Sequence, residues 1–144
     1  MDIYGVDSYS PKEIAERVQT VGVSKAKLPL LPMIALGVLA GGFIGFGALF
    51  YTLVTCDATL GYAAGRLLGG FAFSLGLILV VVAGAELFTG NNLMVMTWVS
   101  GRISLRLMFR NFWIVYLANF AGSIGLAGMV LLSGHWKGNG GAIG

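Results

Sequence analysis

Charged residues are scarce in this sequence, and their scarcity excludes a soluble globular protein. They make up 10% of the 144 residues, while hydrophobic residues make up 57%. A typical soluble domain has about 25% charged and about 45–50% apolar residues. The mean hydropathy of +0.86 is correspondingly high. Because too little polar surface exists to cover a water-soluble globule, lipid must be the outer solvent, and we predict an all-α integral membrane protein.

Cysteine and histidine each occur only once, as Cys56 and His135. A single cysteine permits no intrachain disulfide, and no second cysteine or histidine lies at metal-ligand spacing, so we expect neither a metal nor a cofactor. The sequence also lacks an HExxH motif, paired intramembrane carboxylates and a plausible Ser/His pair. We therefore expect no enzyme activity and no catalytic residues. Residues 1–27 lack the features of a cleaved signal peptide, so the first span is expected to direct insertion.

One long uncharged segment organises the rest of the chain. No charge occurs between Arg66 and Arg102 except Glu86, which follows the apolar run 71–85. A straight helix over residues 67–101 would be about 50 Å long at ~1.5 Å per residue, whereas the hydrocarbon core of a bilayer is ~30 Å thick. The segment must therefore tilt strongly, extend past the membrane or break. A break is tolerated only where the freed backbone is buried in protein or lines a wet cavity.

Glu86 is the intramembrane residue that most strongly indicates a functional site. A lone carboxylate at such depth is costly and by default marks a pathway or a site. Two plain alternatives remain open at this point. The carboxyl group could be protonated, because desolvation raises a carboxyl pKa, or it could be paired with a cation.

The chain divides into an N-terminal segment, three spans and a tail. We expect an N-terminal segment at 1–27 with a short amphipathic helix, spans at about 28–56, 61–100 and 105–134, and a polar, glycine-rich tail at 135–144. The second span should be broken near 77–87. Basic residues gather in the N-terminal segment and at 102–110, so both should be cytoplasmic and the tail outside. The net charge of +3 thus reflects topology and does not indicate nucleic-acid binding.

The N-terminal helix has a clear start signal. Ser10 can cap it, Pro11 suits its first turn, and Glu13 completes a capping box. Ile14, Val18 and Val21 share one face. The pattern is typical of a helix lying at the membrane interface. A movable plug at a pore mouth is the second interpretation.

Small residues recur at helical spacing in the first two spans. In lipid there is no hydrophobic force between helices, so glycines that allow close approach favour association. We interpret both series as packing surfaces and expect the second segment to pack against the first. The series comprise Gly37, Gly41 and Gly45, and then Gly61, Gly65 and Gly69.

The run FSLGLILVVVAGAELFTGN at 73–91 resembles the signature of the formate/nitrite transporter family. The runs AGGFIGFGALFY at 40–51 and SGRISLRLMFRNFWIVYLANFAGS at 100–123 look like that family's first span and its following loop and third span. The resemblance covers residues 10–134. It implies a six-helix, aquaporin-like fold built from two inverted halves, of which this chain matches the first. It also implies a homopentamer in the cytoplasmic membrane.

The resemblance also assigns roles to individual residues. Apolar pore constrictions fall at Phe73, Leu77, Leu87 and Phe88. Thr89 falls where a hydroxyl contacts the permeating anion or the family's pore histidine. Together with backbone N–H groups of the break, it would hold the anion. Without the resemblance, the four apolar residues would be helix-packing residues and Thr89 could bond to its own helix.

Glu86 and Asn91 are expected to be structural polar groups inside the membrane. We expect the Glu86 carboxylate to accept hydrogen bonds from backbone freed by the break. It should not bind the anion, which it would repel.

The function implied is transmembrane transport of small monovalent anions, with formate first. Nitrite or hydrosulfide transport by the same family is an alternative. The family's pore histidine lies in the half that is not matched, and His135 should not take that role. A different class of function, a non-transporting fragment or assembly subunit, fits the glycine series but leaves Glu86 and the over-long second segment unexplained.

Overall fold

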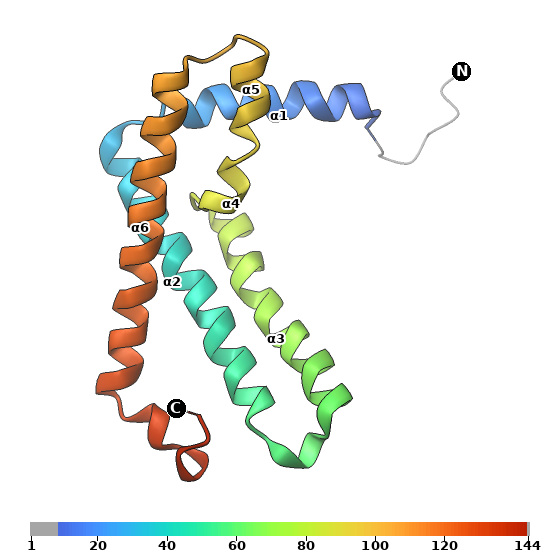
Figure 1. Ribbon diagram of the computed structural model, residues 1–144, viewed down its shortest axis with the longest axis vertical. Helices are drawn as coiled ribbons and strands as arrows, with labels where there is room; N and C mark the ends of the chain where they lie inside the picture. The colour runs from blue at the N-terminus through green and yellow to red at the C-terminus, as the bar shows by residue number, and fades with distance from the viewer. Residues whose placement is uncertain (1–8, 144) are drawn as a thin grey trace.

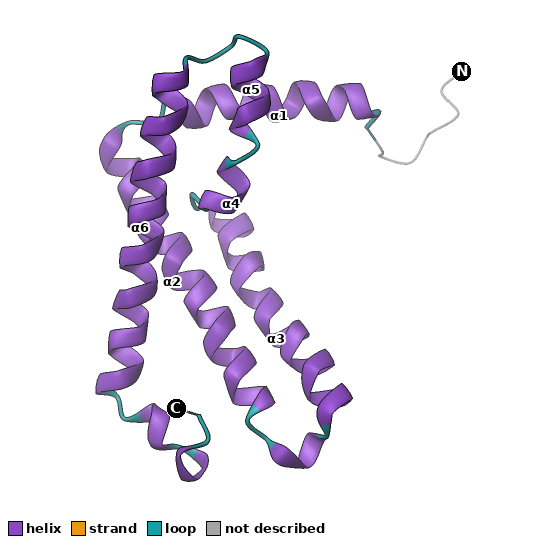
Figure 2. Ribbon diagram, viewed as in Figure 1, coloured by secondary structure: helices purple, strands orange, loops and turns teal. Residues whose placement is uncertain are grey.

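The computed structural model describes residues 9–143, and Figure 2 shows every regular element in this range as a helix. Three helices within it are long and apolar enough to cross a membrane, namely α2 (Leu30–Thr55), α3 (Tyr62–Ala83) and α6 (Leu105–Leu132). Shorter elements are α1 (Pro11–Ala26), η1 (Ala58–Leu60), α4 (Phe88–Asn91), α5 (Met94–Val99), η2 (His135–Lys137) and η3 (Asn139–Gly141). The predicted fold class, three spans with an interrupted second segment, is confirmed.

The three long helices run side by side, with α2 packed against both α3 and α6 (Figure 1). Helix α1 lies across one end of this bundle and packs on α5. The connection between α2 and α3 lies at the opposite end. Of the three arginines at 102–110, Arg102 precedes α6, and Arg106 and Arg110 lie on that helix.

Helix α1 begins with the predicted capping box. The Ser10 hydroxyl accepts a hydrogen bond from the Glu13 backbone N–H, and the Glu13 carboxylate accepts one from the Ser10 N–H at 2.7 Å. Ile14 and Val21 are half exposed, whereas Gly22 and Ala26 are buried against α5 and the loop that follows it. An exposed apolar face on a helix across the bundle end is consistent with an interfacial position.

The hydrogen bonds from Ser10 hold the pKa of the Glu13 carboxyl below its ordinary value. Because the pKa is lower in the folded state, the capping box stabilises α1 fully above the unfolded carboxyl pKa, about 4.3, and this stabilisation is lost as the pH falls through the folded value. We expect a Ser10→Ala variant to return the Glu13 pKa toward its ordinary value. NMR titration of the Glu13 carboxyl measures the change. An unchanged titration would contradict the capping box.

The glycines of α2 allow two neighbours to approach closely, but from different sides. A Cβ at Gly37 would lie 2.6 Å from that of Ala118, and one at Gly41 would collide with the Asn119 backbone, so this series faces α6. The closest approach to α3 lies elsewhere, between Gly47 and Gly76. The expected packing of the second segment on the first is present. Of the series predicted for it, however, only Gly69 lies close to α2 side chains.

We expect Gly76→Ala to separate α2 from α3 and to destabilise the chain. A Cβ there would lie 2.7 Å from the Phe43 carbonyl oxygen, and backbone cannot move aside as a side chain can. Overpacking of this kind costs roughly 1–3 kcal/mol. Thermal unfolding in detergent measures it. Gly70→Ala is the matched control on the same helix, because a Cβ there meets open space. Equal melting temperatures for the two variants would contradict the proposed contact.

Candidate functional site

The second segment breaks at residues 84–87. Helix α3 ends where Gly84 adopts a left-handed conformation, with φ +61° and ψ +31°, a conformation that glycine adopts without steric penalty. The chain then runs irregularly to Leu87, and α4 begins at Phe88. Irregular backbone at membrane depth needs partners within the protein. The Ala85 N–H donates to the Val80 carbonyl at 2.9 Å, and the Glu86 N–H donates to the Leu36 carbonyl of α2 at 3.2 Å.

The side-chain amide of Asn119 on α6 binds both sides of the break. Its Nδ2 donates to the Glu86 carbonyl and to the Gly37 carbonyl of α2, each at 2.8 Å, and its Oδ1 accepts from the Phe88 N–H at 2.9 Å. One side chain thus joins α2, the break and α6. Asn119 was not among the residues predicted for the site. The available signal was a polar side chain in an otherwise apolar third span.

The Glu86 carboxylate is buried and paired. Its Oε1 accepts a hydrogen bond from Lys25 Nζ of α1 at 2.8 Å, and its Oε2 accepts one from Asn91 Nδ2 at 2.8 Å. The prediction that this carboxylate accepts hydrogen bonds from backbone N–H groups of the break is wrong. Lys25 and Asn91 donate to the carboxylate instead, and the Asn119 side chain forms hydrogen bonds with the backbone of the break. Of the open alternatives, pairing with a cation is the one observed.

Asparagines extend this pair into a network. Asn91 Oδ1 accepts from Lys25 Nζ at 2.9 Å, and Asn91 Nδ2 also donates to Asn111 Oδ1 at 2.8 Å. Asn111 in turn donates to the Lys25 carbonyl at 3.3 Å. Asn91 and Asn111 are fully buried. Among the described residues, every buried side-chain nitrogen and oxygen has a partner, as a polar group in a low-dielectric interior requires.

A cavity of about 510 Å³ lies between α1, the end of α3 and α5, beside this network. Leu77, Leu87, Lys25 and Glu86 are among the residues that line it. Two of the residues predicted to lie on the substrate path, Leu77 and Leu87, therefore meet at one cavity. Phe73 lies one helical turn before Leu77 on α3 and is 39% exposed.

Phe88 and Thr89 lie beyond the break. Phe88 lines a different cavity, about 400 Å³ in volume, and packs edge-to-face on Phe112 and Tyr116 of α6. Thr89 is exposed and makes no side-chain hydrogen bond to the described residues. Thr52, by contrast, bonds to the Ala48 carbonyl in its own helix at 2.9 Å. The plain alternative for Thr89, a hydrogen bond to its own helix, is absent in this part of the chain.

Most of the backbone N–H groups around the break are already occupied. Those of Gly84, Ala85 and Glu86 donate to main-chain carbonyls, and that of Phe88 donates to Asn119. These four N–H groups therefore already have partners within the protein, and an anion held at the break would need other donors, such as the Thr89 hydroxyl.

The sequence of this chain is similar to those of known membrane channels. The model of the formate/nitrite transporter family matches residues 12–143. The chain is 38% identical over 128 residues to the formate channel FocA of Haemophilus influenzae, covering 88% of this chain and 45% of that protein. It is 37% identical over 131 residues to FocA of Escherichia coli, covering 90% and 46%.

A solved structure shares the fold. A pentameric formate channel with formate bound superimposes with a TM-score of 0.67 at 33% identity, and the match covers 93% of this chain and 47% of that chain. The chain thus spans about half the length of the curated relatives it matches. Because the family model matches nearly all of this chain, residues 12–143, the chain belongs to the formate/nitrite transporter family.

Proposed function

We propose that this chain forms one half of a transmembrane pathway for small monovalent anions, with formate as the first candidate. The observation that carries the proposal is the broken second segment, held open by Asn119 and the Lys25–Glu86 pair. The likeness of this chain to a formate channel with formate bound supports the choice of anion. Because the match covers 47% of that channel's chain, a complementary half must complete the pathway.

The pathway would run along the exposed side of α3 and past the break. Phe73 and Leu77, four residues apart, share one face of α3. Leu87 is the last residue of the break, and Phe88 begins α4. These four apolar side chains would form constrictions, and the exposed Thr89 hydroxyl would donate a hydrogen bond to the anion between them. Glu86 would keep the break in shape and stay off the path, because its carboxylate is engaged by Lys25 and Asn91.

Passage through apolar constrictions favours the neutral acid over the anion. An unpaired charge moved into a low-dielectric environment carries a large desolvation penalty. The anion would therefore take up a proton in the pore. Glu86 is committed to Lys25, so we assign the proton donor to the complementary half.

The orientation that we propose follows from the basic residues. Lys12, Arg17, Lys25 and Lys27 precede the first span, and Arg102, Arg106 and Arg110 lie between the second and third. Both groups would face the cytoplasm, with the turn between α2 and α3 outside. The assembly would be a pentamer in the cytoplasmic membrane.

Uptake of radiolabelled formate by proteoliposomes, with the oligomeric mass measured on the same sample, tests the function. We expect Thr89→Val to lower uptake about tenfold, the size of one lost hydrogen bond to a charged group. Thr52→Val is the control, because the Thr52 hydroxyl bonds to its own helix. Nitrite and hydrosulfide are tested as competitors. A pentamer-sized particle with its complementary half but without uptake would instead identify a non-transporting assembly subunit.

A further inference from the structure

Helix α4 is too short to hold its own position. It has four residues, Phe88–Asn91, and an isolated helix of this length is unstable because its first turn costs more free energy than it returns. It packs on α6. The side chains of α6 that hold it belong to Asn111, Phe112, Tyr116 and Asn119. The third span therefore determines where α4 lies.

Two aromatic rings of α6, which we call the aromatic clamp, hold the side chain of Phe88. The centroid of the Phe88 ring lies 5.6 Å from that of Phe112 and 5.4 Å from that of Tyr116, with interplanar angles of 78° and 72°. Aromatic pairs prefer this edge-to-face geometry. The Phe88 N–H also donates to Asn119. Backbone and ring of Phe88 are thus both anchored on one helix, which fixes the direction of the ring.

We propose that Phe112 and Tyr116 are positioning residues that set the width of the pathway at Phe88, and with it an upper limit on the size of the anion. The inference rests on the proposed function, which makes Phe88 a constriction. The ring is half-buried, and its side turned away from α6 would border the pathway. A clamped ring does not yield to a larger molecule, because movement off its seat would cost both aromatic contacts.

Uptake of radiolabelled formate and lactate by proteoliposomes that contain this chain and its complementary half tests the clamp. Liposomes without protein give the background for each anion. Phe112→Leu and Tyr116→Leu each remove one ring and leave space into which Phe88 turns. We expect each variant to lower the ratio of formate to lactate uptake about fivefold, by raising lactate uptake. This factor corresponds to ~1 kcal/mol, the size of one aromatic pair.

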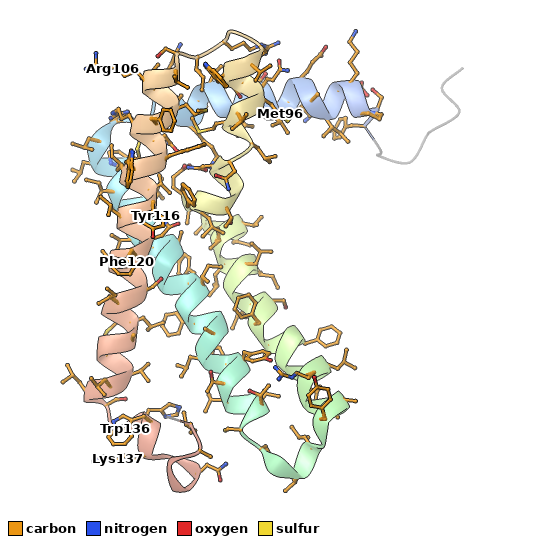
Figure 3. All side chains as sticks on the ribbon, viewed as in Figure 1. Met96, Arg106, Tyr116, Phe120, Trp136 and Lys137 are labelled. Atoms are coloured by element: carbon orange, nitrogen blue, oxygen red, sulfur yellow. The ribbon has the colours of Figure 1, made fainter. Side chains whose placement is uncertain are left out.

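Two further variants separate the clamp from a general effect on stability. Tyr116→Phe keeps the ring and loses only the hydroxyl, so the uptake ratio should stay as in the unmodified chain. Phe120→Leu is the matched control, because Phe120 lies one turn beyond Tyr116 on α6 (Figure 3) and forms no aromatic pair with the described residues. A destabilised protein would lose uptake of both anions together, whereas a loosened clamp changes their ratio.

The mobility of the Phe88 ring is a second measurement, and it does not require the complementary half. Fluorine NMR of the detergent-purified chain, with 4-fluorophenylalanine in place of Phe88, follows this ring alone. We expect a broad signal from the clamped ring and a narrower one in the double variant Phe112→Leu/Tyr116→Leu, because the freed ring reorients faster. Circular dichroism checks that the double variant keeps its helices. Equal line widths in the two proteins would show that the clamp does not hold the ring.

Failure of the clamp and failure of the proposed function give different results. If both leucine variants keep the ratio of the unmodified chain, while formate uptake and its dependence on Thr89 are intact, the clamp is wrong and the proposed function stands. If the unmodified chain with its complementary half takes up no formate, the proposed function is wrong, and the clamp is overturned with it. A Phe120→Leu variant that changes the ratio as much as Phe112→Leu would also overturn the clamp.

Discussion

Replacement of Asn119 by leucine is expected to destabilise the chain more than any other single substitution in the third span. Leucine keeps the approximate size of the side chain but removes its three hydrogen bonds, two to the break and one to the Gly37 carbonyl of α2. The Glu86 carbonyl and the Phe88 N–H would then lack partners in a low-dielectric interior. Each such group costs roughly 1–3 kcal/mol, and a chain of this size loses ~2–4 °C in melting temperature per kcal/mol. We expect a decrease of about 10 °C.

Ser123→Ala is the matched control for this experiment. Ser123 lies one turn further along α6, and its hydroxyl donates to the Asn119 carbonyl at 2.9 Å and the Gly41 carbonyl at 3.2 Å. Both carbonyls belong to long helices, so each keeps its hydrogen bond within the helix when the hydroxyl is lost. Thermal unfolding in the same detergent compares the two variants. If Asn119→Leu melts within a degree or two of Ser123→Ala, the amide does not hold the break.

The second large effect is expected at the Lys25–Glu86 pair. The Glu86 side chain is 7% exposed, whereas that of Lys25 is 27% exposed. Lys25→Met leaves a buried carboxylate without its cation, and removal of one partner of a buried pair typically costs about 3–5 kcal/mol. Glu86→Gln should cost less, because the amide can still bond to Asn91 and the more exposed ammonium can reach water.

A double-mutant cycle separates the pair from its surroundings. We expect the double variant Lys25→Met/Glu86→Gln to be more stable than Lys25→Met alone, because no uncompensated charge remains. Denaturant unfolding measures the three variants against Lys27→Met, in which an exposed lysine two residues away is neutralised. A Lys25→Met variant as stable as Lys27→Met would show that the pair contributes nothing.

The break was predictable because it follows from length and charge. Residues 67–101 are too long for one straight span, and Glu86 falls within them, so an interruption near it satisfied both constraints. Family, fold class and half-length match also followed from the sequence, since the run at 73–91 is long and specific. The roles of Phe73, Leu77, Leu87, Phe88 and Thr89 stay predictions.

The partners of the break could not be predicted, because they come from distant parts of the chain. Lys25 precedes Glu86 by 61 residues and contacts it only because α1 folds across the bundle end. The basic residues of the N-terminal segment, Lys25 among them, were interpreted as topology signals, and Asn119 was assigned no role. Charge and polarity were visible at both positions, but the direction of a side chain depends on tertiary packing. The burial of Asn91 and Asn111 depends on it too.

The dependence of the break on Asn119 has a consequence for the order of biogenesis. A ribosome delivers α3 and the break to the membrane before it delivers α6. Until Asn119 arrives, the Glu86 carbonyl and the Phe88 N–H have no partner from the third span. The first two spans would therefore enter the bilayer as an incomplete hairpin whose interrupted segment is sheltered by water or the insertion machinery. Entry of α6 would then supply the Asn119 partners of the break.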